Sequence, residues 1–326
     1  MSRGPNLFLL GARVAGRLPE QVVRAVLLVG ADIAWLQHGP GVRQLERNLR
    51  RAQPDADARA VRRLSRAGMR NYLRYFGEAF ILGRLSNEQL LARVTPVTSA
   101  DVSAELAEGR SVVLALGHQG NWDLAGAWAT VHLGPVTTVA ERLEPPEVFA
   151  EFVALRERLG MTIIPLDHGG DVFRELVRAV RTGAVLVPLL ADRDLTARGV
   201  EVQLFGHRAR VAVGPAALAV ATGSQLVPVT LRHERLRGAR RRAAGARWGL
   251  TVTFHDAVPV PAGSRPEQVQ QMTQGWVDVL AQDIREHPTH WHMLQKVFVD
   301  DLDPDRYAAT TATPGLRHPA GEETTS

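Results

Sequence analysis

The spacing of hydrophobic positions changes near residue 100. Before it, residues 5–37 carry apolar side chains at helical intervals, which favours one or two amphipathic helices. Residues 57–84 repeat the pattern more strongly, with Val61, Leu64 and Tyr72 among the positions on one apolar side. The first third of the chain is therefore predicted to be helical.

After residue 100, short β-rich runs alternate with helical patterns. Strands are predicted at 112–117, 136–141, 162–166, 184–191, 200–205, 225–232 and 250–254. Helices are predicted at 122–132, 146–159, 171–182, 214–222 and 265–286. This alternation predicts an α/β fold in which helices flank a central mixed β-sheet.

The predicted helix 57–84 also carries arginines at every third or fourth position. Their spacing places them on one helix face: Arg59, Arg63, Arg66, Arg70 and Arg74. Such a face is either simply solvated or contacts anionic lipid headgroups. Leu7, Phe8 and Leu9, further toward the N-terminus, are candidates for apolar insertion into a bilayer. The basic stretch 234–249 favours a solvated loop between two strands.

Composition narrows the classes of function. At roughly 100–200 residues per domain, 326 residues allow one large domain or two small ones. No cysteine is present, which excludes thiolate nucleophiles, thiolate metal sites and disulfides. The formal net charge of +5 favours anionic partners such as a phospholipid surface, a phosphorylated cofactor or nucleic acid. No apolar run reaches the roughly 18–20 residues that a spanning helix needs.

Several common catalytic motifs do not occur. The chain has no G-x-S-x-G elbow, no Walker loop and no G-x-G-x-x-G after a strand. HPTHWHML (287–294) groups three histidines, but their spacing is not that of a zincin helix. A metal site and packing by Trp291 and Met293 both remain open there, and packing is favoured.

The stretch GHQGNWDLAG (117–126) is the main chemical candidate, because it follows the apolar strand 112–116 directly. His118 and Asp123 are five positions apart, and Gly117 and Gly120 permit a sharp turn between strand and helix. A carboxylate near an imidazole fixes its tautomer and stabilises the imidazolium, so this H-x4-D pattern suits a histidine general base. The alternative is a core histidine with a helix N-cap.

Longer motifs resolve part of that choice by resemblance. The chain closely resembles the actinobacterial phosphatidylinositol mannoside acyltransferases, within the glycerolipid-type and lipid A-type acyltransferases that carry H-x4-D behind a strand. The likeness covers about residues 10–302. The matching segments, in order, are LALGHQGNWDLAGAW (114–128), TTVAERLEPPEVFAEFVALRERLG (137–160), ADRDLTARGVEVQLFG (191–206), RVAVGPAALAVATGSQLVP (210–228) and HPTHWHMLQ (287–295).

The resemblance implies transfer of a fatty acyl chain, typically palmitoyl from acyl-CoA, to the 6-hydroxyl of a mannose. That mannose is joined to position 2 of inositol in a phosphatidylinositol mannoside. Acyl-CoA would be a substrate, so no permanently bound cofactor and no metal are expected. The implied partners are this glycolipid and an anionic membrane surface, with no nucleic acid. The implied location is peripheral, on the cytoplasmic side of the cell membrane.

The resemblance also assigns roles residue by residue. The catalytic set is His118, Asp123 and Asp192. The substrate-binding set is Asn121, Trp122, Glu141, Arg142, Arg156 and Arg193. Asp192, the expected partner of the histidine, stands where relatives commonly have glutamate, and Gly117 where they commonly have proline. The sequence leaves open whether Asp123 or Asp192 orients His118.

We expect residues 1–302 to form one acyltransferase domain. It would contain a membrane-associating helical part to about residue 90 and a catalytic core from about residue 100, followed by a disordered tail, 303–326. Two other functions stay open: acylation of another acceptor, such as a lipid A-like glycolipid or a membrane alcohol, or lipid binding without catalysis. The acyl-chain preference, the number of mannoses on the acceptor and the oligomeric state are not fixed by the sequence.

Overall fold

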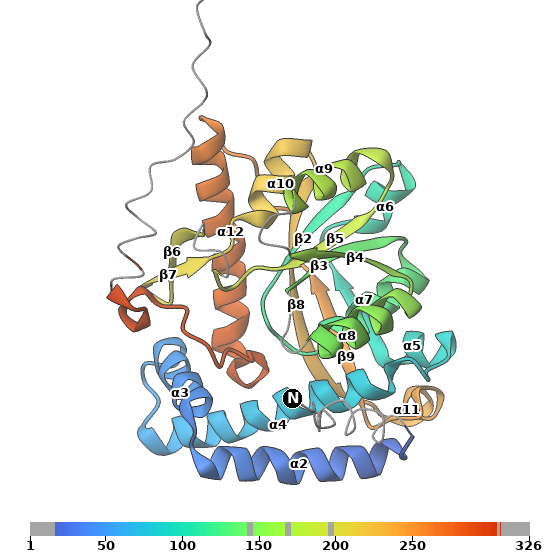
Figure 1. Cartoon of the computed structure of the whole chain (residues 1–326), viewed down its shortest axis with the longest axis vertical. Coiled ribbons are helices and arrows are strands. Elements are labelled where there is room, and N and C mark those ends of the chain that lie inside the picture. The colour runs from blue at the N-terminus through green and yellow to red at the C-terminus, as the bar shows by residue number, and fades with distance from the viewer. Residues whose placement is uncertain (1–16, 142–145, 167–170, 195–198, 305–306, 308–326) are drawn as a thin grey trace, which may run out of the picture.

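A seven-stranded mixed sheet forms the centre of the computed structural model, which describes residues 17–141, 146–166, 171–194, 199–304 and 307 (Figure 1). The strand order is β1-β9-β8-β2-β5-β3-β4. The strands are β1 (Val94–Thr98), β2 (Val112–Leu116), β3 (Val136–Glu141), β4 (Met161–Leu166), β5 (Leu186–Leu190), β8 (Gln225–Arg235) and β9 (Trp248–Phe254). Only the β8–β9 pairing in this sheet is antiparallel, so the prediction of a mixed α/β sheet is confirmed.

Strand 200–205 was expected with the others but belongs elsewhere. β6 (Val200–Leu204) pairs with β7 (His207–Val211) in a separate two-stranded antiparallel sheet. Alternating hydrophobicity identifies a strand but not its partner, because the pairing depends on tertiary contacts.

Helices cover both faces of the main sheet. Those of the expected alternation are α7 (Trp122–His132), α8 (Pro146–Arg158), α9 (Val172–Thr182), α10 (Gly214–Thr222) and α12 (Arg265–Glu286). Short connecting elements not predicted from the sequence are α5 (Asn87–Arg93), α6 (Val102–Ala107), α11 (Gly238–Ala244), η1 (Pro288–His290) and η2 (Val299–Asp301). The stretch 234–249 is therefore the end of β8, a short helix and the start of β9, rather than a plain loop.

The sequence of β2 shows how the two layers form. Val113 and Ala115 pack with α9, α10 and α12 on one face, whereas Val112, Leu114 and Leu116 pack with α7 on the other. Successive side chains of a strand point to opposite faces, so the fully apolar β2 is buried on both sides. The central strand is thereby held rigidly, and so is the chain that leaves its carboxyl end.

The N-terminal helices lie along one end of this core. They are α2 (Glu20–Gln37), α3 (Pro40–Ala52) and α4 (Ala58–Leu82), and α2 runs beside α4 at the lower edge of Figure 1. Helix α4 matches the predicted helix 57–84, begins at the N-cap Asp57 and contacts the core through its inner face. The candidates for apolar insertion at 7–9, and most of the expected tail 303–326, lie outside the described residues.

The structure corrects the idea of one basic surface face on α4. Helix α2 packs along that face: Leu27 packs at Gly77, and Asp32 forms ion pairs with both Arg66 and Arg70, whose side chains stay 45% and 41% exposed. These arginines hold the pKa of Asp32 well below its usual range. One carboxylate offsets one positive charge, so Asp32 and the two arginines together keep a net charge of +1.

Arg74 is also removed from the proposed lipid contact. Its guanidinium stacks on Trp248, 3.9 Å from the ring centroid, and burial lowers its pKa to about 10. Arg59 and Arg63, near the start of α4, remain exposed. Helical spacing identified the shared face correctly, but it could not show that another helix lies on it.

Among the described residues, no single helix is long and apolar enough to cross a bilayer. In the described part of the chain, only α2 and α3 taken together have the length and apolar composition of a membrane span, and the two helices meet at 83°.

Candidate active site

His118 and Asp192 meet at the carboxyl ends of two neighbouring parallel strands. In the β2–β5 register Leu116 pairs with Leu190, so each of the two residues lies two positions beyond the same rung of the sheet. His118 Nδ1 lies 2.5 Å from Asp192 Oδ1, and the backbone N–H of His118 donates to Asp192 Oδ2 at 2.9 Å. The carboxyl ends of parallel strands are a common location for ligand sites in α/β folds.

Asp192 is completely buried and accepts several hydrogen bonds. The indole N–H of Trp291 donates to Asp192 Oδ2 at 2.8 Å, beside the backbone N–H of His118. Burial raises the pKa of Asp192, but the neighbouring His118 and these donors outweigh it and hold that pKa below its ordinary value. The residue that orients His118 is therefore Asp192, an ionised carboxylate.

The segment HPTHWHML lies against the His118 loop, which sequence reasoning did not foresee. The backbone N–H of His292 donates to the His118 carbonyl at 2.7 Å, and that of Gly120 donates to the His290 carbonyl at 3.2 Å. Trp291 and Met293 are fully buried, so the expectation of packing is confirmed. The described residues contain no group of three His, Cys, Asp or Glu side chains that could hold a metal ion.

The two glycines of the loop are required for different reasons. Gly120 has φ +53°, and a Cβ there would lie 2.9 Å from the backbone of Leu231. A Cβ on Gly117 would lie 2.9 Å from Leu280 and 3.2 Å from Asp192 Oδ2. Gly120 thus permits the turn, while Gly117 leaves room for the aspartate.

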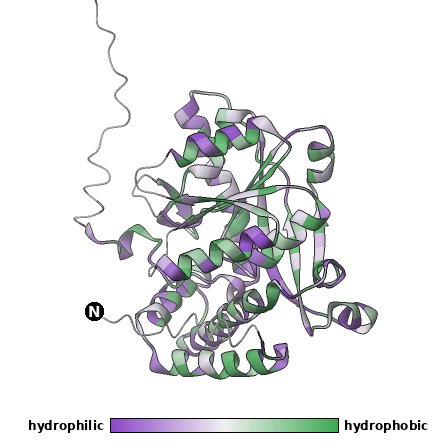
Figure 2. Cartoon of the chain, turned by 45° about the vertical axis from the view of Figure 1, so that its right-hand side comes forward, coloured by the Kyte–Doolittle hydropathy of each residue, from purple (hydrophilic) through white to green (hydrophobic). Residues whose placement is uncertain are grey.

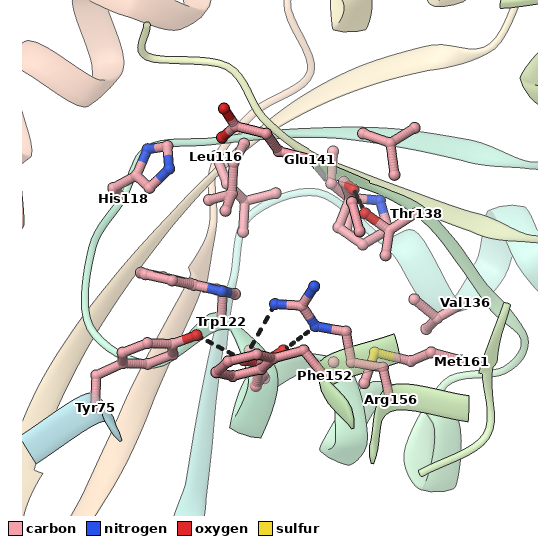
Figure 3. Close-up of a pocket in the computed structure, with 18 of the residues that line it drawn as sticks. Tyr75, Leu116, His118, Trp122, Val136, Thr138, Glu141, Phe152, Arg156 and Met161 are labelled. Carbon is pink, nitrogen blue, oxygen red and sulfur yellow. Dashed lines mark hydrogen bonds and ion pairs between the residues drawn. The ribbon is translucent and has the colours of Figure 1, made fainter. Parts of the chain in front are cut away.

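Asp123 does not contact His118, so Asp192 is the one of the two candidate aspartates that lies against the histidine. It accepts from Arg156 Nε at 2.6 Å and from the hydroxyl of Tyr75 at 2.8 Å (Figure 3). Asp123 lies in the first turn of α7, on the side facing α8 and α4. The ion pair raises the pKa of Arg156 although burial opposes it, and burial near Asp123 raises that of Tyr75.

Asn121, expected in the substrate-binding set, is engaged within the protein. It is fully buried, its side-chain oxygen caps α7 by accepting from Leu124 N at 2.9 Å, and its amide donates to Glu78 Oε2 at 2.8 Å. Glu78 in turn lies 3.2 Å from His233 Nε2. Both polar ends of the Asn121 side chain therefore have partners within the protein, at the start of α7.

A cavity of about 510 Å³ extends from His118 between the sheet and helices α7 and α8. Figure 3 shows His118 and Trp122 at one end of it and Val136 and Met161 at the other. Most of the lining is aliphatic or aromatic, and the volume falls within the range typical of pockets that enclose a small ligand. The cavity can therefore hold an apolar chain whose reactive end lies at His118.

A few polar groups project into this cavity. Arg156 lines it beside Asp123, and Arg193 lines it while forming an ion pair with Glu141 at 2.7 Å. Trp122 packs edge-on to His118, and its indole N–H has no acceptor among the described residues. The structure thus brings Trp122, Glu141, Arg156 and Arg193 together, while Arg142 lies outside the described residues.

This arrangement can perform acid–base chemistry on a hydroxyl. One imidazole nitrogen of His118 is held by Asp192, and no hydrogen bond from a described residue engages the other. The imidazole side chain remains 19% exposed at the mouth of the cavity. An imidazole fixed in this way can accept a proton at Nε2 while the carboxylate stabilises the resulting cation.

Comparisons with known proteins identify the family of the chain. The model of the bacterial lipid A biosynthesis acyltransferases matches residues 6–299. The chain is 36% identical to a phosphatidylinositol mannoside acyltransferase of Mycolicibacterium smegmatis, over 91% of this chain and 92% of that protein. It is 39% identical to one of Mycobacterium tuberculosis, over 89% and 87% respectively.

Among solved structures, a 1-acyl-sn-glycerophosphate acyltransferase from Thermotoga maritima matches with a TM-score of 0.34 and 13% identity, covering 83% of this chain and 98% of that one. The match of the family model along nearly the whole chain, together with these two relatives, places the protein: it belongs to the bacterial lipid A biosynthesis acyltransferase family.

Proposed function

We propose that the protein transfers a fatty acyl chain, palmitoyl in the first instance, from acyl-CoA to the 6-hydroxyl of a mannose on a phosphatidylinositol mannoside. The observation that carries this proposal is the His118–Asp192 pair at the end of a long apolar cavity. The names of the two mycobacterial relatives support the choice of acceptor.

In the proposed reaction His118 acts as the general base. Its Nε2 accepts the proton of the mannose hydroxyl, and the oxygen attacks the thioester carbonyl carbon. The carbon–sulfur bond then breaks, and the imidazolium returns the proton to the thiolate, so that the products are the ester and free coenzyme A. Asp192 stabilises the imidazolium between these two steps.

The other groups in the cavity are proposed to place the donor. The acyl chain occupies the apolar part, the indole N–H of Trp122 is available to the thioester carbonyl, and Arg156 and Arg193 present positive charge to the polar part of the substrates. A buried donor without a partner costs free energy, which a bound carbonyl would recover.

The acceptor is a lipid, so we place the protein on the cytoplasmic face of the cell membrane as a peripheral protein. No step of the proposed chemistry requires a resident metal or cofactor.

A direct test mixes the purified protein with palmitoyl-CoA and one acceptor at a time, and follows free thiol and the acylated product by mass spectrometry. We expect product only with the mannosylated phosphoinositide. Product with a lipid A-like glycolipid or another membrane alcohol would assign that compound as the acceptor. No product with any of them would favour lipid binding without catalysis.

A further inference from the structure

The stretch 234–249, which the proposed reaction does not use, forms one wall of a second cavity. This cleft, of about 480 Å³, lies between the N-terminal end of α2 and the segment around α11. Its lining includes Arg24 from one wall and Arg241, Arg242 and Arg247 from the other. In Figure 1, α11 lies beside the N-terminal end of α2, at the lower edge of the molecule.

The two walls are held together independently of those arginines. The buried Arg93 donates to Glu20 of α2 at 2.7 Å and to the Ala244 carbonyl of α11 at 3.1 Å. Arg240 donates to the Ala92 carbonyl at 2.9 Å and pairs with Glu234. The cleft is therefore a built feature of the fold rather than a gap between loose segments.

The charge of the cleft is not balanced inside it. Glu20, the acidic residue that lines it, is engaged by Arg93. None of Arg24, Arg241, Arg242 and Arg247 forms an ion pair with a described residue. The half-buried Trp248, which also lines the cleft, has an indole N–H without an acceptor in the described part of the chain. Guanidinium groups that line one cleft and form no ion pair with a described residue suit a phosphate.

The outer face of α2 indicates where such a phosphate comes from. Val22, Val26, Val29, Ile33 and Leu36 are spaced as one helical stripe and are 43–67% exposed. Figure 2 shows this helix, at the lower edge, with hydrophobic residues along much of its length. An apolar stripe of this kind on an outer helix is typical of a surface that inserts into the bilayer interface.

We infer that the cleft binds the phosphate of an anionic membrane lipid while the outer face of α2 enters the bilayer interface. A helix inserted by its apolar face sinks about 5–10 Å into the boundary between headgroups and acyl chains. A helix is about 10 Å across, so its flank, where the cleft begins, lies at the level of the lipid phosphates. Helix α2 packs on α4, and α4 lines the catalytic cavity through Tyr72, Tyr75 and Phe76.

This inference rests on the proposed membrane association but not on the acyl-transfer chemistry, so its test measures binding. Full-length protein is co-sedimented with vesicles of phosphatidylcholine alone and with 30% phosphatidylinositol. The variant Arg241→Gln/Arg242→Gln/Arg247→Gln should lose on the order of a hundredfold in affinity for the anionic vesicles and keep its weak affinity for the neutral ones.

The matched control is Arg174→Gln/Arg178→Gln/Arg181→Gln on α9, which removes the same charge at the opposite end of the molecule (Figure 1). It should lose less than about twofold, because those charges are screened from a bilayer at α2. Val26→Ser/Val29→Ser should weaken binding to both kinds of vesicle.

Two results would overturn the inference. The first is an affinity of the cleft variant for anionic vesicles that equals that of the wild type or of the α9 control. The second is that calorimetry detects binding of inorganic phosphate, that the cleft variant loses this binding, and that its affinity for vesicles is unchanged. A failure of acyl transfer alone would leave these binding results unchanged, so the two proposals can fail separately.

Discussion

Replacing Asp192 by asparagine should remove the general base without removing the histidine. Three N–H groups converge on this carboxylate: two on Oδ2, from the His118 backbone and Trp291, and that of His118 Nδ1 on Oδ1. An amide has one acceptor oxygen, which the two donors at Oδ2 will retain. The amide NH2 then faces His118 Nδ1, so the imidazole must turn Nδ1 into an acceptor and carry its proton on Nε2.

The size of the loss follows from that tautomer. A histidine with a proton on Nε2 cannot accept one from the mannose hydroxyl, so the whole contribution of the base is lost. General bases contribute about 10²–10⁴-fold, which corresponds to about 3–5 kcal/mol of activation free energy. Asp192 is fully buried and does not line the cavity, so KM for acyl-CoA should change less than about threefold.

The assay is the initial rate of thiol release at saturating acceptor. Asp283→Asn is the matched control: Asp283 is also buried beside the loop, where it accepts from Gln119 at 2.8 Å, but it does not contact His118. The control should stay within about fivefold of wild type, and Asp192→Glu, which keeps the charge, should retain more activity than Asp192→Asn. A kcat above a tenth of wild type for Asp192→Asn, or an equal loss in the control, would refute this account of the carboxylate.

Three further outcomes are expected. Gly126→Leu, whose Cβ would lie 2.7 Å from Met161 Sδ at the far end of the cavity, should lower transfer of palmitoyl more than transfer of decanoyl, and equal losses in a chain-length series would contradict a depth limit there. Trp291→Phe removes one donor to Asp192 and should lower kcat by about three- to tenfold with KM unchanged; a change confined to KM would assign the indole elsewhere. His290, whose pKa burial lowers to about 3, stays neutral while an unfolded histidine protonates below about 6.5. The unfolding free energy should therefore fall between pH 7 and pH 5, by up to about 2 kcal/mol from this residue, and urea titrations of His290→Gln should show a smaller fall than wild type.

Much of the fold could be predicted because its signals are local. The alternation of buried strands and amphipathic helices from residue 112 onward matches the structure closely, since each element has a periodicity of its own. Helix α3 was missed although Val42, Leu45 and Leu49 stand at helical spacing, and strand β1 was not predicted. The β6–β7 pairing was missed because it depends on a partner strand.

Site residues were predictable where they lie in the H-x4-D motif or in a segment that resembles the family. His118 stands out after a buried strand, and Asp192 was assigned by resemblance. Trp291 could not be found, because no local pattern indicates that residues 287–294 return to the loop after β2. The partners of Asn121 and Asp123 could not be predicted, because their spacing from His118 does not reveal which side of the α7 start they face.

The most direct measurement of the central claim is acyl transfer by His118→Ala on the mannosylated phosphoinositide, in a single turnover with excess enzyme and palmitoyl-CoA. Asp192 keeps its hydrogen bonds from the His118 backbone and Trp291, so the variant should fold, as judged by a cooperative thermal unfolding transition, and should still bind the donor. We predict a rate of acyl transfer at least about a hundredfold below wild type. A folded variant that retains more than a tenth of the wild-type rate would contradict the assignment of His118 as the base.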